Sequence, residues 1–131
     1  MTETTPVQHA HAAFITGWSS DFLLQRLQRK LLEWQLENFK AGSEWPASLH
    51  LFALGVAEEA GELAHAVLKR AQYIRGMQDE AAFLEAAGDA IADCAIFCIQ
   101  ACSALGLDFS TLLYLTAEEV MNRTAESLKK P

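Results

Sequence analysis

Residues 90–107, AIADCAIFCIQACSALGL, come closer than any other stretch of the chain to a continuous apolar run. From Ala90 to Leu107 the only charged residue is Asp93, so a helix formed here would be apolar on nearly every side. Such a helix is normally buried among other helices. Asp93 and Gln100 interrupt the run, which leaves it short of the roughly 18 uncharged apolar residues that a membrane-spanning helix needs. We therefore expect a core helix of a globular protein, with no membrane-spanning segment.

The rest of the chain has the composition of an all-α protein. Ala, Leu, Glu, Gln and Lys are frequent, Gly and Pro lie at the edges of periodic segments, and no hairpin dipeptide separates alternating strands. The sequence predicts helices from Ser20 or Asp21 to about residue 40, from Ser48 to about residue 74, from Asp79 to residues 105–106, and from Asp108 or Ser110 until the chain frays before residue 131. The first helix is expected to bury an apolar stripe made of Leu23, Leu27, Leu31 and Trp34.

The predicted organisation is a flexible tail over residues 1–18 and one all-α domain over residues 19–131. Four helices with short connections favour an antiparallel four-helix bundle, closed either within the chain or by a second subunit. Because small helical domains often complete their core by oligomerising, we expect a homodimer or homotetramer.

Acidic residues outnumber basic ones by 17 to 10, which gives the 131-residue chain a formal charge of −7. This charge disfavours binding to duplex nucleic acid or to an anionic membrane surface. A polyanionic substrate such as a nucleoside triphosphate would need a local positive element, for which a bound divalent cation is the obvious choice. The N-terminal residues lack the basic and apolar segments of a secretory signal, so a cytoplasmic location is expected.

Cys94, Cys98 and Cys102 follow one another at four-residue spacing and so lie along one face of a helix. This spacing is not that of a disulfide framework. The simpler interpretation is small core residues in a reducing cytosol, because a site for a soft metal would need further ligands nearby.

The second predicted helix carries a pair of acidic residues beside its apolar stripe. On a helical wheel Glu59 borders the stripe of Phe52, Val56 and Leu63, and Glu62 lies about 60° to the other side, one turn along. Glu58 is displaced by about 100° from Glu59. It is expected to lie behind the direct ligands of a site or to be solvated.

A second acidic pair, Asp89 and Asp93, lies at four-residue spacing on the core helix. Two acidic pairs on facing helices repel unless a cation lies among them, and carboxylate ligands suit Mg²⁺, with Mn²⁺ as the alternative. The chemistry indicated is metal-assisted hydrolysis of a phosphoanhydride, with Glu58 or Glu59 orienting or deprotonating the attacking water. The competing interpretation is a solvated face of the helix, to which the position of Asp93 is the main objection.

These residues resemble the MazG-like all-α nucleoside triphosphate pyrophosphatases. Residues 54–64, LGVAEEAGELA, are similar to the first half of the family signature, and residues 88–93, GDAIAD, continuing to residues 105–108, are similar to the second half. Upstream, Glu33-Trp34-Gln35 with Asn38-Phe39 resembles the first helix of one branch, and residues 120–123 resemble its C-terminal end. The resemblance covers about residues 20–125.

The resemblance implies that Glu59, Glu62 and Asp93 are metal ligands and that Glu58 is an accessory ligand or positions water. The commoner second motif has Glu three residues before the Asp, where this chain has Ala90, and Asp89 is the natural substitute. The implied reaction is cleavage between the α and β phosphates to a nucleoside monophosphate and pyrophosphate, often as housekeeping of noncanonical or excess nucleotides.

Candidate substrate contacts fall into two groups. For the phosphates they are Lys69, Arg70 and Arg123, each of which could equally be a solvated surface cation. For the base they are Trp34, Asn38 and Phe39, because aromatic rings stack on bases and an amide can read a base edge. Core packing is the alternative role for Trp34.

Two other classes of protein are compatible with parts of the sequence. Glu62 and His65 form one Glu-x-x-His step of a ferritin-like di-iron bundle, but that class needs two such steps, and His65 falls on the outer side of the wheel. A non-catalytic dimerisation adaptor would keep the apolar stripes, but it has no need of an acidic residue such as Asp93 inside.

Overall fold

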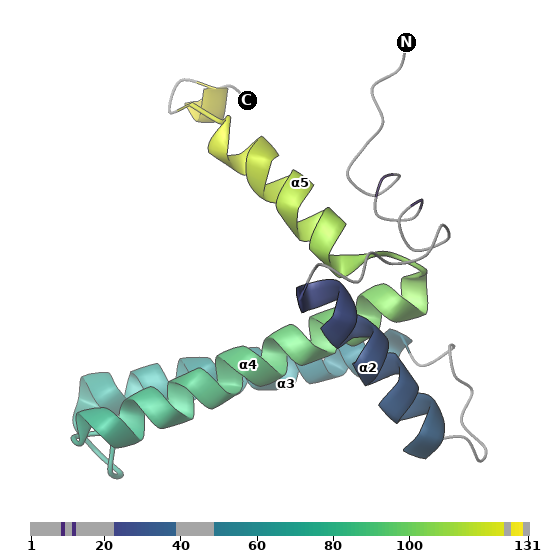
Figure 1. Ribbon diagram of the computed structural model, residues 1–131. Coiled ribbons are helices and arrows are strands. Elements are labelled where there is room, and N and C mark those ends of the chain that lie inside the picture. The colour runs from purple at the N-terminus through teal and green to yellow at the C-terminus, as the bar shows by residue number, and fades with distance from the viewer. Residues whose placement is uncertain (1–8, 10–11, 13–22, 39–48, 125–126, 130–131) are drawn as a thin grey trace.

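The computed structural model describes residues 9, 12, 23–38, 49–124 and 127–129, and over these residues the chain is all-helical (Figure 1). The helices are α2 (Leu23–Asn38), α3 (Leu49–Gln72), α4 (Glu80–Leu105) and α5 (Phe109–Met121), followed by the short 3-10 helix η1 (Ser127–Lys129). His9 and Ala12 are also helical. The predicted all-α class is confirmed, whereas most of the predicted tail and the predicted caps Ser20, Asp21 and Ser48 lie outside the described residues.

Helices α3 and α4 lie side by side as a long antiparallel hairpin (Figure 1). Their closest approach is at Gly55, where an added Cβ would lie 2.5 Å from Cδ1 of Phe97. Buried small or aromatic side chains fill the rest of the seam, namely Phe52, Ala66, Ala87 and Ala90. Because small side chains let two backbones approach, this composition explains why α3 packs along the length of α4.

The turn between α3 and α4 is held by Arg70. Its Nη1 donates hydrogen bonds to the carbonyl oxygens of Met77 at 2.8 Å and Gln78 at 2.7 Å, and its guanidinium lies over the ring of Phe83, 5.6 Å from the centroid. Tyr73 and Arg75 adopt left-handed backbone angles, with φ of 58° and 54°, which are costly for residues other than glycine. The contacts of Arg70 offset this strain and fix the hairpin end.

Helix α4 has the boundaries that the sequence predicts. Asp79 is the N-cap, accepting a hydrogen bond from the amide of Ala81 at 3.2 Å, and Gly106 ends the helix in the left-handed conformation with φ of 68°. Asp108 then caps α5 by accepting from the amide of Thr111 at 2.7 Å. These caps are confirmed at the residues named from sequence.

Helix α2 is attached to α4 and α5 through buried amides. Gln28 is fully buried, and its Nε2 donates to Ser103 Oγ at 3.0 Å and to the carbonyl oxygen of Leu107 at 2.8 Å. Its Oε1 accepts from the amide of Phe109 at 2.9 Å. A second amide pair, Gln100 Nε2 to Gln35 Oε1 at 3.3 Å, lies further along α2. Gln28 thus satisfies backbone groups left over where α4 ends and α5 begins.

The apolar stripe predicted to be the inner face of α2 is in large part wrong. Leu23 is 72% exposed, Leu27 39% and Trp34 49%, whereas the buried residues of α2 are Gln25, Gln28 and Gln35. The hydrogen bonds of Gln28 to the junction of α4 and α5 turn the glutamine face inward, which leaves these three residues of the stripe outside.

The described helices do not close into one antiparallel bundle within the chain. Helix α5 leaves α4 at an angle of 107° and leads away from the hairpin (Figure 1).

None of the described helices is by itself long and apolar enough to cross a membrane, although α4 and α5 together, as a bent pair, could do so by length and composition alone.

Substituting glycines on α3 tests the close contact in the hairpin. Gly55→Ala is expected to destabilise the protein by about 1–3 kcal/mol, because the new methyl group meets the ring of Phe97. Gly61→Ala is the matched control: its Cβ would have nothing within 4 Å, and the gain in helix propensity predicts stabilisation by about 1 kcal/mol. Urea denaturation measures both, and equal effects of the two substitutions would contradict the packing.

Replacing Gln28 tests the attachment of α2. Gln28→Ala leaves the amide of Phe109 and the carbonyl of Leu107 without their partner, which is expected to cost about 2–4 kcal/mol of unfolding free energy. Gln72→Ala, at an exposed residue of α3, should change stability by less than about 0.5 kcal/mol. A loss for Gln28→Ala no larger than that of the control would show that α2 is held by other contacts.

Candidate metal centre

The antiparallel register of α3 and α4 brings the two predicted acidic pairs to the same part of the seam. Gly55 lies against Phe97. One helical turn along each helix from that contact come Glu59 on α3 and Asp93 on α4, and about a turn further come Glu62 and Asp89. The acids of the two helices therefore face each other, and the facing follows from the helix register alone.

Glu59 lies at the centre of this cluster. Its carboxylate pKa is raised above the ordinary value of 4.5, first because burial removes solvent from the charged group, then because of the negative charges of Asp93, Glu62, Glu58 and Asp89, in that order. All four other predicted acids thus act on one carboxylate. Glu59 and Asp93 are half-buried, whereas Glu58, Glu62 and Asp89 are exposed.

The cluster occupies positions where the seam would otherwise be apolar. Along α3, Phe52, Gly55 and Ala66 are buried, and Glu59 and Glu62 fall between them in the same spacing of three and four residues. Along α4, Asp93 lies between Ala90 and Phe97 in the same way. Glu59 and Asp93 are partly shielded from solvent and all five acids carry the same charge, so a cation among them would reduce their mutual repulsion.

The donor set fits a hard divalent ion. The five side chains offer carboxylate oxygens, the ligands that Mg²⁺ and Mn²⁺ prefer. In the part of the chain that is described, no three His, Cys, Asp or Glu side chains are arranged to hold a metal ion together. Ion binding would therefore require rotation of the Glu and Asp side chains toward a common point, where the ion would offset their mutual repulsion.

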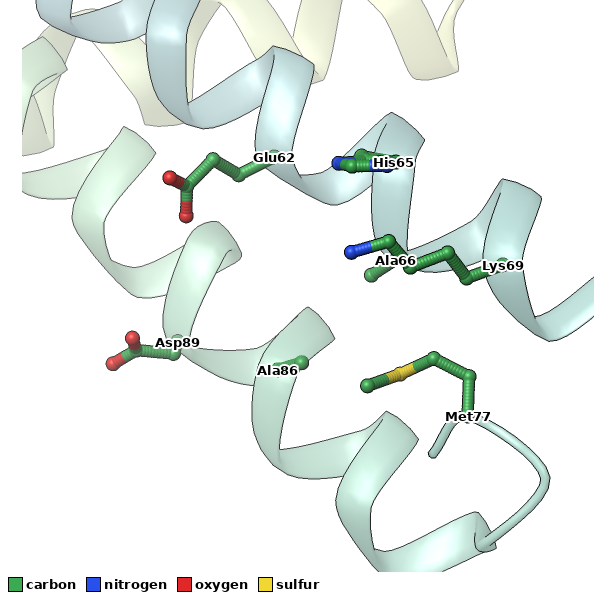
Figure 2. Close-up of a pocket in the computed structure, with 7 residues that line it drawn as sticks. All are labelled: Glu62, His65, Ala66, Lys69, Met77, Ala86 and Asp89. Atoms are coloured by element: carbon green, nitrogen blue, oxygen red, sulfur yellow. The ribbon is translucent and has the colours of Figure 1, made fainter. Parts of the chain in front are cut away.

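A cavity of about 280 Å³ adjoins the cluster between α3 and α4 (Figure 2). It is lined by Glu62, His65, Ala66, Lys69, Met77, Ala86 and Asp89. Figure 2 shows the polar ends of Glu62, His65 and Lys69 extending from α3 toward the same side of the seam. Two of the acids and the ammonium group of Lys69 thus line the same cavity. Of the predicted phosphate contacts, Lys69 is the one that shares a cavity with the acids.

The other predicted substrate contacts are placed elsewhere. Arg70 is engaged by the carbonyl oxygens of the α3–α4 turn. Asn38 donates a hydrogen bond from Nδ2 to the carbonyl oxygen of Trp34 at 2.7 Å, so its amide serves the end of α2. Arg123 is exposed and follows α5. Among the described residues neither α2 nor α5 packs on α3, so Trp34, Asn38 and Arg123 are not brought to the acids within one chain, and Phe39 lies outside the described residues.

Two larger side chains of the cavity, His65 and Met77, were not among the site residues predicted from sequence. His65 is exposed, as predicted, yet it lines the cavity, and its spacing of three residues after Glu62 and four before Lys69 could have indicated this. Met77 reaches the cavity from the turn (Figure 2), a position that no periodic pattern encodes.

Cys102 is buried in the core, whereas Cys94 and Cys98 are partly exposed. Burial, followed by the neighbouring Cys98 and Asp108, raises the pKa of the Cys102 thiol to about 11, and burial also raises the pKa of Cys98. Both thiols are therefore protonated near neutral pH, whereas metal ligation and nucleophilic chemistry need the thiolate. This favours the packing role over a soft-metal site.

Comparison with known proteins gives no match: no protein-family model, no curated protein and no solved structure is significantly similar to this chain. The likeness to MazG-like enzymes accordingly stays a prediction carried by the motif residues.

The raised pKa of Glu59 predicts a stability that depends on pH. Since the folded state holds the Glu59 proton more tightly than the unfolded chain, the unfolding free energy falls as pH rises above 4.5 and through the raised pKa. In EDTA-containing buffer at neutral pH, Glu59→Gln is expected to be more stable than the wild-type protein, and the difference should vanish well below pH 4.5. Glu37→Gln, at an exposed position of α2, serves as control. The unfolding free energy of each protein is measured by urea denaturation across this pH range. If it changes with pH in the same way for the wild-type protein and Glu59→Gln, the cluster is ruled out.

Proposed function

We propose that this protein is a magnesium-dependent nucleoside triphosphate pyrophosphohydrolase that cleaves the α–β phosphoanhydride to a nucleoside monophosphate and pyrophosphate. The observation that carries the proposal is the position of Glu59 at the seam of two packed helices, where the negative charges of Asp93, Glu62, Glu58 and Asp89 all act on its carboxylate and raise its pKa. A cluster of this charge has little structural value without a cation, and a polyphosphate is the substrate that a cation would attract.

The proposed ligands are Glu59, Glu62 and Asp93, with Asp89 in place of the family Glu that is absent at Ala90. A bound Mg²⁺ or Mn²⁺ supplies neutralisation of phosphate oxygens and lowers the pKa of a coordinated water. Glu58 or Glu59 orients the water and accepts its proton. The water oxygen bonds to the α phosphorus, the bond from that phosphorus to the bridging oxygen breaks, and the bridging oxygen leaves with the electron pair on pyrophosphate.

The proposed assembly is a cytoplasmic homodimer or homotetramer. Large apolar side chains are exposed on all four described α-helices, among them Leu23, Leu54, Ile91, Leu105, Leu113 and Met121. Exposed apolar surface on this scale is unusual for a monomer, and contact between copies of the chain would cover it. In such an assembly Trp34, Asn38 and Arg123 would contact the nucleotide from a second subunit, since their own chain does not bring them to the acids.

A non-catalytic dimerisation adaptor is the second candidate, favoured by the same exposed apolar side chains. It accounts for the helices but not for carboxylates at the seam positions between Gly55 and Ala66. A ferritin-like centre is disfavoured by the single Glu-x-x-His step, Glu62 to His65. A pyrophosphohydrolase explains both the acids and the adjoining Lys69.

A panel of ribo- and deoxynucleoside triphosphates tests the reaction. With Mg²⁺ we expect release of pyrophosphate from at least one member, complete loss with EDTA, and a fall in kcat/KM of at least about a hundredfold for Asp93→Asn with helicity retained by circular dichroism. Glu37→Gln should keep full activity. Release of orthophosphate, or hydrolysis that persists in EDTA, would contradict the proposal.

A further inference from the structure

We infer that the cavity between α3 and α4 is the subsite for the terminal phosphates of the substrate and, after cleavage, for pyrophosphate. This inference rests on the proposed function and adds the direction in which the nucleotide lies. The α phosphate faces Glu59 and Asp93, and the β and γ phosphates extend along the cavity toward Lys69 and the α3–α4 turn.

The chemistry of the lining matches a phosphate shared between a metal ion and a lysine. Glu62 and Asp89 belong both to the acidic cluster and to the cavity. Lys69 is the one permanently positive side chain among the described residues that line the cavity, and it is partly buried. An ammonium group in a partly dehydrated position binds phosphate oxygens through charge-assisted hydrogen bonds. The neighbouring His65 adds a further ring N–H that can donate to an oxygen.

The distances along α3 suit a diphosphate. Seven residues separate Glu62 from Lys69, which is about 10 Å of helix. Helical side chains lean toward the N-terminus, so the Lys69 ammonium lies closer to Glu62 than its backbone does (Figure 2). A diphosphate could therefore reach from a cation held near Glu62 to the ammonium group of Lys69.

The two ends of the cavity indicate the direction. Its volume of about 280 Å³ leaves room for the terminal phosphates, and its opening to solvent leaves the rest of the nucleotide outside. One end leads to the turn, where Met77 contributes to the lining and Arg70 holds the chain in place. The other end leads along the seam to Glu59 and Asp93. Because the proposed α phosphate faces Glu59 and Asp93, the nucleoside lies beyond that end, which leaves the terminal phosphates for the end at Lys69.

Small side chains make the cavity available. Ala66 and Ala86 form its lining on the two helices, and neither carries a group that could bind a ligand by itself. Their contribution is space, so enlarging one of them closes the subsite without removing a charge. This gives a second variant that is independent of Lys69.

Calorimetric titration of inorganic pyrophosphate with Mg²⁺ into the full-length protein tests the subsite. We expect Lys69→Met to weaken binding by about tenfold or more, Lys69→Arg to restore most of it, and Lys30→Met, at an exposed lysine of α2, to leave it unchanged. Ala86→Leu should abolish pyrophosphate binding while Mn²⁺ binding to the acids persists. Circular dichroism confirms that each variant is folded.

The outcomes separate this inference from the proposed function. Wild-type binding of pyrophosphate that neither Lys69→Met nor Ala86→Leu changes would overturn the subsite, and so would undetectable pyrophosphate binding by a wild-type protein that hydrolyses nucleoside triphosphates. Both results leave the hydrolase standing. A wild-type protein that hydrolyses no nucleoside triphosphate in the panel overturns the proposed function itself, and with it the subsite.

Discussion

The close contact of Gly55 with Phe97 fixes how α3 lies on α4, and the candidate metal centre depends on that register. Since the helices run antiparallel, each turn away from this contact sets a new pair of residues opposite each other: Glu59 near Asp93, then Glu62 near Asp89. A slip of one residue would turn one of the two acidic pairs away from the seam. The packing of small side chains therefore decides the electrostatics of the site, although none of those side chains is polar.

The cost of the cluster is the strongest indication of its purpose. Four further carboxylates act on the half-buried Glu59 and raise its pKa, so the charged form of this side chain is unfavourable for the fold. Sequences that break such a local rule usually do so at functional sites. Lys69 on the adjoining cavity is a cationic counterpart, and a divalent ion between the acids and a phosphate would balance the remaining charge.

Local signals predicted much of this structure, and contacts between distant residues account for what they missed. The caps Asp79, Gly106 and Asp108 are encoded within a few residues of the helices that they end, and the wheel position of Glu59 depends only on α3. The inward face of α2 could not be predicted, because Gln28 binds residues 75 to 81 positions away in the sequence. The spacing of the leucines alone therefore predicted the wrong inward face for α2. The arrangement of Met77 and Lys69 around one cavity likewise depends on a turn with two strained residues.

Binding of a divalent ion among the seam carboxylates is expected to relieve their mutual repulsion. Titration of Mn²⁺ followed by electron paramagnetic resonance measures this directly, because free and protein-bound Mn²⁺ have different spectra. We expect saturable binding that Mg²⁺ competes away and that both Glu59→Gln and Asp93→Asn abolish. Mn²⁺ binding of equal strength in the wild-type protein and in both variants, or no binding to any of them, would contradict it.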